Sequence, residues 1–150
     1  MNQINEMIKI ATIHVEKIQL ALKNIEDSFP INGSKITDLS EKEMLFIELL
    51  INRFAKLQDY LGRTLINEFL KKTKDYEDQM TMIDKINKIE KLGIIESSEL
   101  WDDMRKARNH IAHEYPDYPE LSAMYLNQIF TMAPALIGVF EKIREYTDEN

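Results

Sequence analysis

No cysteine occurs among the 150 residues of the chain. This absence excludes a disulfide scaffold and any zinc site built on thiolates, and it suits a reducing compartment. No apolar run approaches the roughly 20 residues that span a membrane. The first residues lack a basic segment followed by an apolar one, so we expect no signal peptide. We therefore expect a cytoplasmic protein that does not associate with membranes.

Basic residues are in the minority, with 19 Lys and Arg against 26 Asp and Glu, for a formal net charge of −7. Non-specific affinity for nucleic acid comes mostly from neutralising phosphates, so the balance disfavours a high-affinity DNA-binding protein. A nucleic-acid function would need a local basic groove, or an enzyme that holds its substrate transiently. The acidic surface also leaves room for a protein partner with a basic surface.

Apolar residues recur in steps of three and four along most of the chain, and no segment alternates like a β-strand. The pattern predicts helices over residues 3–28, 40–72, 79–91, 98–114 and 119–146. The loops between them are brief, and no repeat, low-complexity segment or linker is present. We therefore expect a single all-α domain over residues 1–150, an up-and-down four-helix bundle with an additional short helix.

Local signals define several of these helices. Ser40 and Glu43 have the spacing of a capping box, and Ser97 or Ser98 can cap the fourth helix. In the short helix, we expect four side chains to point inward: Met82, Ile83, Ile86 and Ile89. The helix over 40–72 carries an apolar face too wide for one seam. This width suggests that the helix is buried both in the core and in a subunit interface, as in a homodimer.

The stretch 101–118 contains two of the three histidines of the chain. At about 100° per helical residue, its apolar side chains form one core face, with Arg108 at the border. A polar row points away from that face: Arg105, Asn109 and His113. His110 points further round and is expected to be a bystander or a dimer contact. His14, beside the stripe of the first helix, is expected to be an ordinary solvated side chain.

The polar row has a chemical use. An imidazole exchanges a proton near neutral pH, and a guanidinium holds a phosphate while it stays charged. Together, His113 and Arg108 can cleave RNA without a metal or cofactor, because the ribose 2′-hydroxyl supplies the nucleophile. Asn109 can hold a phosphate oxygen or orient the histidine. One row is a sparse site, and a two-fold dimer would bring two rows together.

The string Arg108-Asn109-x-x-x-His113-x-Tyr115 resembles the Arg-x4-His-x-Tyr signature of HEPN-domain ribonucleases, in the HepT branch. HepT proteins are toxins encoded beside a small nucleotidyltransferase antitoxin, the MNT protein. The resemblance implies that Arg108 and His113 are the catalytic pair and face each other across a homodimer. It places Asn109 at the supporting polar position, and it implies transient binding of RNA and no cofactor.

The same resemblance makes Tyr115 the acceptor on which the MNT partner places AMP to silence the toxin. We expect the tyrosine ring to project freely, because the helix must end before Pro116. The AMP group would block RNA by its charge and its bulk.

Two alternatives stay open. The chain could be a non-catalytic helical subunit that binds a nucleotidyltransferase or presents substrate to it. A metal-dependent enzyme is a weaker alternative, based on His110-x-x-His113-Glu114. Di-iron bundles use a Glu-x-x-His spacing from paired helices, whereas here the histidines face away from the core and no other helix offers a match. We therefore expect no metal.

Overall fold

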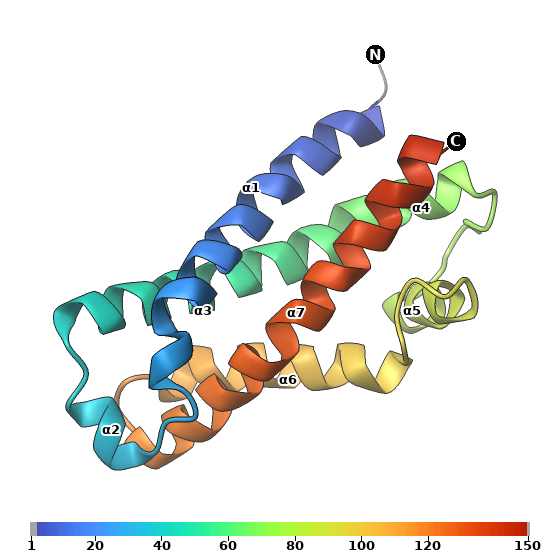
Figure 1. Ribbon diagram of the computed structural model, residues 1–150. Coiled ribbons are helices and arrows are strands. Elements are labelled where there is room, and N and C mark those ends of the chain that lie inside the picture. Colours follow the sequence, from blue (N-terminus) through green and yellow to red (C-terminus); the bar gives the residue numbers. More distant parts are fainter. Residues whose placement is uncertain (1–2, 150) are drawn as a thin grey trace.

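Within residues 3–149, which the computed structural model describes, every regular element is helical (Figure 1). The elements are α1 (Gln3–Ile25), the 3₁₀ turn η1 (Glu26–Ser28), α2 (Gly33–Thr37), α3 (Glu41–Tyr60), the π-helical η2 (Leu61–Leu65), α4 (Ile66–Lys72), α5 (Met82–Lys91), α6 (Ser98–Glu114) and α7 (Pro119–Glu149). The predicted all-α bundle is confirmed.

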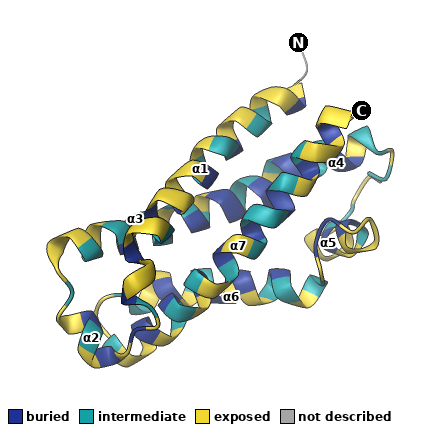
Figure 2. Ribbon diagram, in the orientation of Figure 1, coloured by how far each residue is buried: buried dark blue, intermediate teal, exposed yellow. Residues whose placement is uncertain are grey.

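The core is built on α1, α3 and α7, with α6 packed across α7 (Figure 1). Each helix turns a buried stripe inward and leaves an exposed stripe outside (Figure 2). The predicted seam of α7 is fully buried: Leu126, Ile129, Ala133, Leu136, Phe140 and Ile143. The capping box at the start of α3 is present, with Ser40 Oγ accepting from the Glu43 amide at 3.1 Å. Spacing of three and four therefore identified the main packing faces.

The helix predicted over 40–72 is continuous, but it passes through a π-helical turn between α3 and α4. Its apolar stripe repeats in steps of four: Leu57, Leu61, Leu65 and Phe69. In a regular α-helix each step of four drifts by about 40°. A π turn holds more residues than an α turn and so offsets that drift. All four side chains are buried as a result.

Three local predictions were wrong. The segment after Pro30 is not only a loop, because Asn32 caps the short helix α2 through a bond from the Lys35 amide. In α5, Ile86 and Ile89 are buried, but Met82 and Ile83 are 38% and 72% exposed, because the contacts of α5 with α4 and α6 leave these two side chains partly uncovered. The last helix continues to Glu149.

One helix, α7, has a window long and apolar enough to cross a membrane by length and composition alone. The expectation from the sequence, that no apolar run is long enough to span a membrane, does not cover this window. Of that window, 44% is buried inside the bundle.

Candidate functional site

The motif residues lie on α6, whose position is fixed by a cap and by one buried face. Ser97 Oγ accepts a hydrogen bond from the Leu100 amide at 3.1 Å and satisfies one free donor of the first turn. Most of the predicted core face is confirmed, because Trp101, Met104, Ala107 and Ile111 are buried and Leu100 is half-buried. Ala112, predicted at the flank of that face, is exposed. This helix therefore presents its polar side in a defined orientation.

Arg108 is held by two acceptors. Its Nη2 donates to Asp59 Oδ2 at 2.6 Å, and its Nη1 donates to Asn109 Oδ1 at 3.1 Å. The side chains of Arg108 and Asp59 are 33% and 41% exposed, so the pair lies at the edge of the core rather than inside it. The contact fixes the guanidinium between α3 and α6 and leaves its remaining donors for a ligand. Sequence analysis missed Asp59 as its partner, because the two are 49 positions apart.

His113 lies on a different side of α6 from Arg108. It is exposed, and within the described residues it makes no hydrogen bond or ion pair. Five helical residues correspond to a rotation of about 140°, so one protomer directs the two side chains apart. Arg105 is also exposed, and its Nη2 donates to Asp102 on its own helix at 2.8 Å. Within one protomer, Asn109 is therefore hydrogen-bonded to Arg108, whereas His113 is hydrogen-bonded to neither of them.

Tyr115 follows the last residue of α6, as predicted, but its ring does not project freely. The ring is half-buried and packs against the core. Burial raises the pKa of the Tyr115 hydroxyl above its ordinary value, and the nearby Glu48 carboxylate raises it further. The expectation of free exposure was wrong, because the ring packs against the core near Glu48 of α3.

Beside Arg108, a small cleft of about 130 Å³ runs between α3, η2 and α6, and a shallower depression of about 260 Å³ continues it towards α1. Asp59 and Arg63 line both. Together the two hollows contain four cationic side chains, Lys56, Arg63, Arg105 and Arg108, and Asp59 is the one carboxylate among their lining residues. A local basic surface therefore exists on an acidic chain.

His14 belongs to this surface and is not simply solvated. Its Nδ1 lies 3.1 Å from Arg53 Nη1, and because arginine can only donate, the ring accepts. Partial burial lowers the pKa of His14, and the charges of Arg53 and Lys56 lower it further. The lowered pKa favours the neutral imidazole, which does not add to the charge of Arg53. Sequence spacing gave no signal for this contact, which joins α1 to α3.

His110 lies on the opposite side of α6 from the cleft. Its ring stacks on Tyr125 of α7, with centroids 4.7 Å apart and planes 8° apart. Tyr125 carries no local sequence signal for this contact, which joins two helices. As for metals, among residues 3–149 no group of three His, Asp or Glu side chains is arranged to hold an ion.

Comparison of the chain with models of protein families, with curated protein sequences and with solved structures gave no match in any of the three. The likeness to HEPN ribonucleases therefore depends on the motif of α6 and on the order of the helices.

Proposed function

We propose that this chain is an RNA-cleaving toxin of the HepT type that acts as a homodimer and is neutralised by an MNT nucleotidyltransferase. One observation carries the proposal. Arg108 and His113 of the Arg-x4-His-x-Tyr string lie on one ordered helix and Tyr115 directly follows it, with Arg108 fixed in a cation-lined cleft and His113 open to solvent. A fixed guanidinium, an accessible imidazole and a local basic surface are what metal-independent cleavage of a phosphodiester needs.

In the proposed reaction, the ribose 2′-oxygen forms a bond to the adjacent phosphorus as the bond to the 5′-oxygen breaks. The products are a 2′,3′-cyclic phosphate and a 5′-hydroxyl end. His113 takes the proton from the 2′-hydroxyl, and a proton is returned to the departing 5′-oxygen. Arg108 donates to the phosphoryl oxygens, on which charge develops, while Asp59 and Asn109 hold its guanidinium in place.

The divergence of Arg108 and His113 on α6 supports a composite site. Two protomers related by a two-fold axis can place Arg108 of one against His113 of the other. The wide apolar surface on the second long helix supports such contacts, since Met44 and Leu45 near the start of α3 are 40% and 66% exposed.

A mixing experiment tests both the chemistry and the site. Arg108→Ala and His113→Ala homodimers are each expected to lose RNA cleavage and growth inhibition while staying folded. When equal amounts are mixed and allowed to exchange, half of the dimers are mixed and each has one intact composite site. Cleavage should therefore return to about one quarter of the wild-type rate, because a composite site takes one residue from each protomer.

Two results would contradict the proposal. Failure of the mixture to recover cleavage, with exchange verified by a tagged protomer, would refute the composite site. A wild-type protein that neither cleaves RNA nor slows growth would favour the alternative, a non-catalytic subunit that serves a nucleotidyltransferase.

In the proposed control step, the Tyr115 oxygen attacks the α-phosphorus of ATP within the MNT partner. Pyrophosphate leaves, and the phenolic proton passes to a base of the partner. The half-buried ring and the raised pKa of its hydroxyl mean that the partner must supply that base. The added AMP places a phosphate close to His113, two residues away along the chain, and so excludes RNA.

A further inference from the structure

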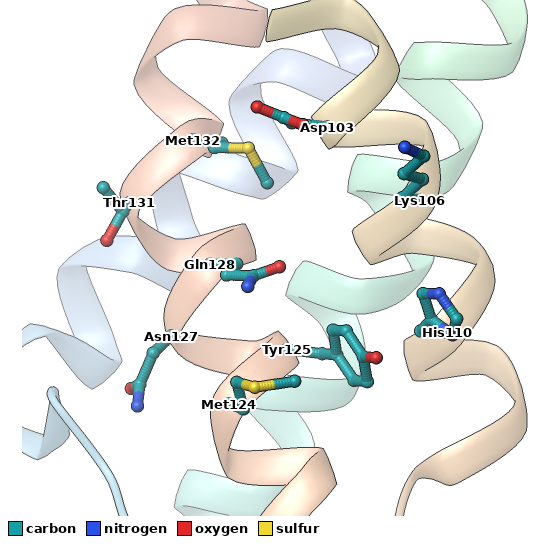
Figure 3. A pocket seen from close by; sticks show the side chains of 9 residues that line it. All are labelled: Asp103, Lys106, His110, Met124, Tyr125, Asn127, Gln128, Thr131 and Met132. Carbon is teal, nitrogen blue, oxygen red and sulfur yellow. The ribbon is translucent and has the colours of Figure 1, made fainter.

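A groove of about 660 Å³ lies between α6 and α7 (Figure 3). Helical geometry puts its α6 lining on the opposite side of that helix from Arg108. Its lining residues are Asp103, Lys106, His110, Met124, Tyr125, Asn127, Gln128, Thr131 and Met132. The volume lies within the range of small-ligand sites, about 300–1,000 Å³. The side chains mix aromatic rings, thioethers and amides, which suits a planar heterocycle better than a simple ion.

We propose that this groove binds one unpaired base of the RNA substrate, next to the phosphodiester that is cut. The inference rests on the proposed function and names a binding subsite for it. The stacked rings of His110 and Tyr125 form the platform, because unpaired bases are recognised chiefly by stacking on aromatic side chains. His110 remains exposed and Tyr125 is half-buried, so a base that enters can continue the stack.

Two amide side chains of α7 line the groove, and only one of them has free polar atoms to recognise the base. Both polar atoms of the Asn127 side chain are already used: its Oδ1 accepts from the Ile31 amide at 2.9 Å and its Nδ2 donates to the Ile31 carbonyl at 2.8 Å. Gln128 is exposed, and within the described residues its amide makes no hydrogen bond. Figure 3 shows the Gln128 amide directed between the two helices, where it can donate to and accept from a base edge.

Charge along the α6 wall orients a nucleotide within the groove. Asp103 lies at one end and repels a phosphate. Lys106 follows one turn later, with an ion pair to Asp102 at 3.0 Å that is largely exposed and so easily exchanged. His110 and then His113 continue along the same side of the helix, in steps of four and three. The phosphate of a stacked nucleotide is therefore favoured towards His113, where the proposed reaction takes place.

The inference is tested by RNA binding in the non-cleaving His113→Ala protein, so that binding is separated from cleavage. The probe is a short labelled single-stranded RNA. It is compared with a series of RNAs of the same sequence, each of which lacks the base at one position. Fluorescence anisotropy at low ionic strength gives each affinity. Two double variants are made in the His113→Ala protein. One carries Tyr125→Leu, which removes the half-buried ring, and the other carries His110→Gln, which alters an exposed position with little risk to the fold.

We expect one abasic position to weaken binding by about five- to one-hundred-and-fifty-fold, the range expected for one stacked base. Tyr125→Leu and His110→Gln should weaken binding of the intact RNA, and the abasic substitution should then have little further effect. Tyr125→Phe, which keeps the ring, should bind like the parent. Tyr118→Leu is the matched control, since Tyr118 is 58% exposed near the start of α7 and does not line the groove.

The inference is overturned if no single abasic position matters, if the two groove variants bind RNA as tightly as the parent, or if no RNA is bound. It is also overturned if both variants alter the oligomeric state without altering the abasic effect, because the groove is then a protein interface. Base-dependent binding by a wild type that cuts no RNA would refute the proposed function alone. Cleavage without any base dependence would refute the groove alone.

Discussion

Removing the charge of Asp59 without changing its shape tests how Arg108 is held. In Asp59→Asn, the 2.6 Å contact to Arg108 Nη2 loses its ionic component while the side-chain volume is kept. Both side chains are between 33% and 41% exposed, so solvent screens much of the attraction. Partly exposed pairs contribute about 0.5–1 kcal/mol, because side-chain entropy and hydration offset the attraction.

We therefore expect Asp59→Asn to lower the free energy of unfolding by about 0.5–1 kcal/mol, measured by urea denaturation. In a chain of this length, that corresponds to a fall in Tm of about 1–4 °C. The difference should shrink in 1 M salt, where the Debye length falls to about 3 Å. RNA cleavage should also fall, since the charge-assisted bond that anchors the guanidinium becomes a weaker neutral one.

A double-mutant cycle with Arg108→Gln isolates the pair. A coupling free energy of about 0.5 kcal/mol or more supports the ion pair as a positioning contact. If the two substitutions are additive within about 0.3 kcal/mol, and if Asp59→Asn cleaves RNA like wild type, then Asp59 does not position Arg108.

Two further predictions concern Tyr115. Incubation with the MNT partner and ATP should add the mass of AMP to the wild-type chain but not to Tyr115→Phe, as seen by mass spectrometry; modification that persists in the variant would refute the assignment. Glu48→Gln should lower the pKa of Tyr115 without restoring its ordinary value, because burial is the larger cause of the shift. A tyrosine absorbance titration against Tyr115→Phe measures this, and an unchanged pKa would show that Glu48 does not act on the ring. With the folded pKa raised, the contribution of Tyr115 to stability is present at neutral pH and is lost as pH rises through that pKa.

Most of the fold follows from periodicity, because burial of an apolar stripe is what stabilises each helix. The seam of α7 and most of the core face of α6 were predicted correctly, Ser40 was predicted as a cap, and Ser97 was one of two candidate caps. The helix over 40–72 contained a further signal in its repeated steps of four, which fit a π turn better than a regular helix. Met82 and Ile83 were misplaced, because periodicity gives a face but not the extent to which neighbours cover it.

The sequence predicted the positions of the candidate site residues on α6, but not their contacts with other helices. Local spacing placed Arg108 at the edge of the core and His113 outside it. Contacts between distant segments have no local signature, so Asp59 beside Arg108, Arg53 beside His14, and Tyr125 on His110 needed the three-dimensional structure. The half-buried state of Tyr115 was missed for the same reason.

The intrinsic fluorescence of Trp101 can report on ligand binding at one side of α6. It is the one tryptophan of the sequence, is 6% exposed, and lines the same cleft as Arg105 and Arg108. Gly62 of the π turn lies against its ring so closely that a methyl group there would come within 3.3 Å of Cζ2. Tryptophan fluorescence therefore reports only on the cleft that contains Arg108, because Trp101 is its sole source. A mononucleotide confined to the groove beside Tyr125 would leave that emission unchanged, whereas a longer RNA that reaches Arg108 would alter it.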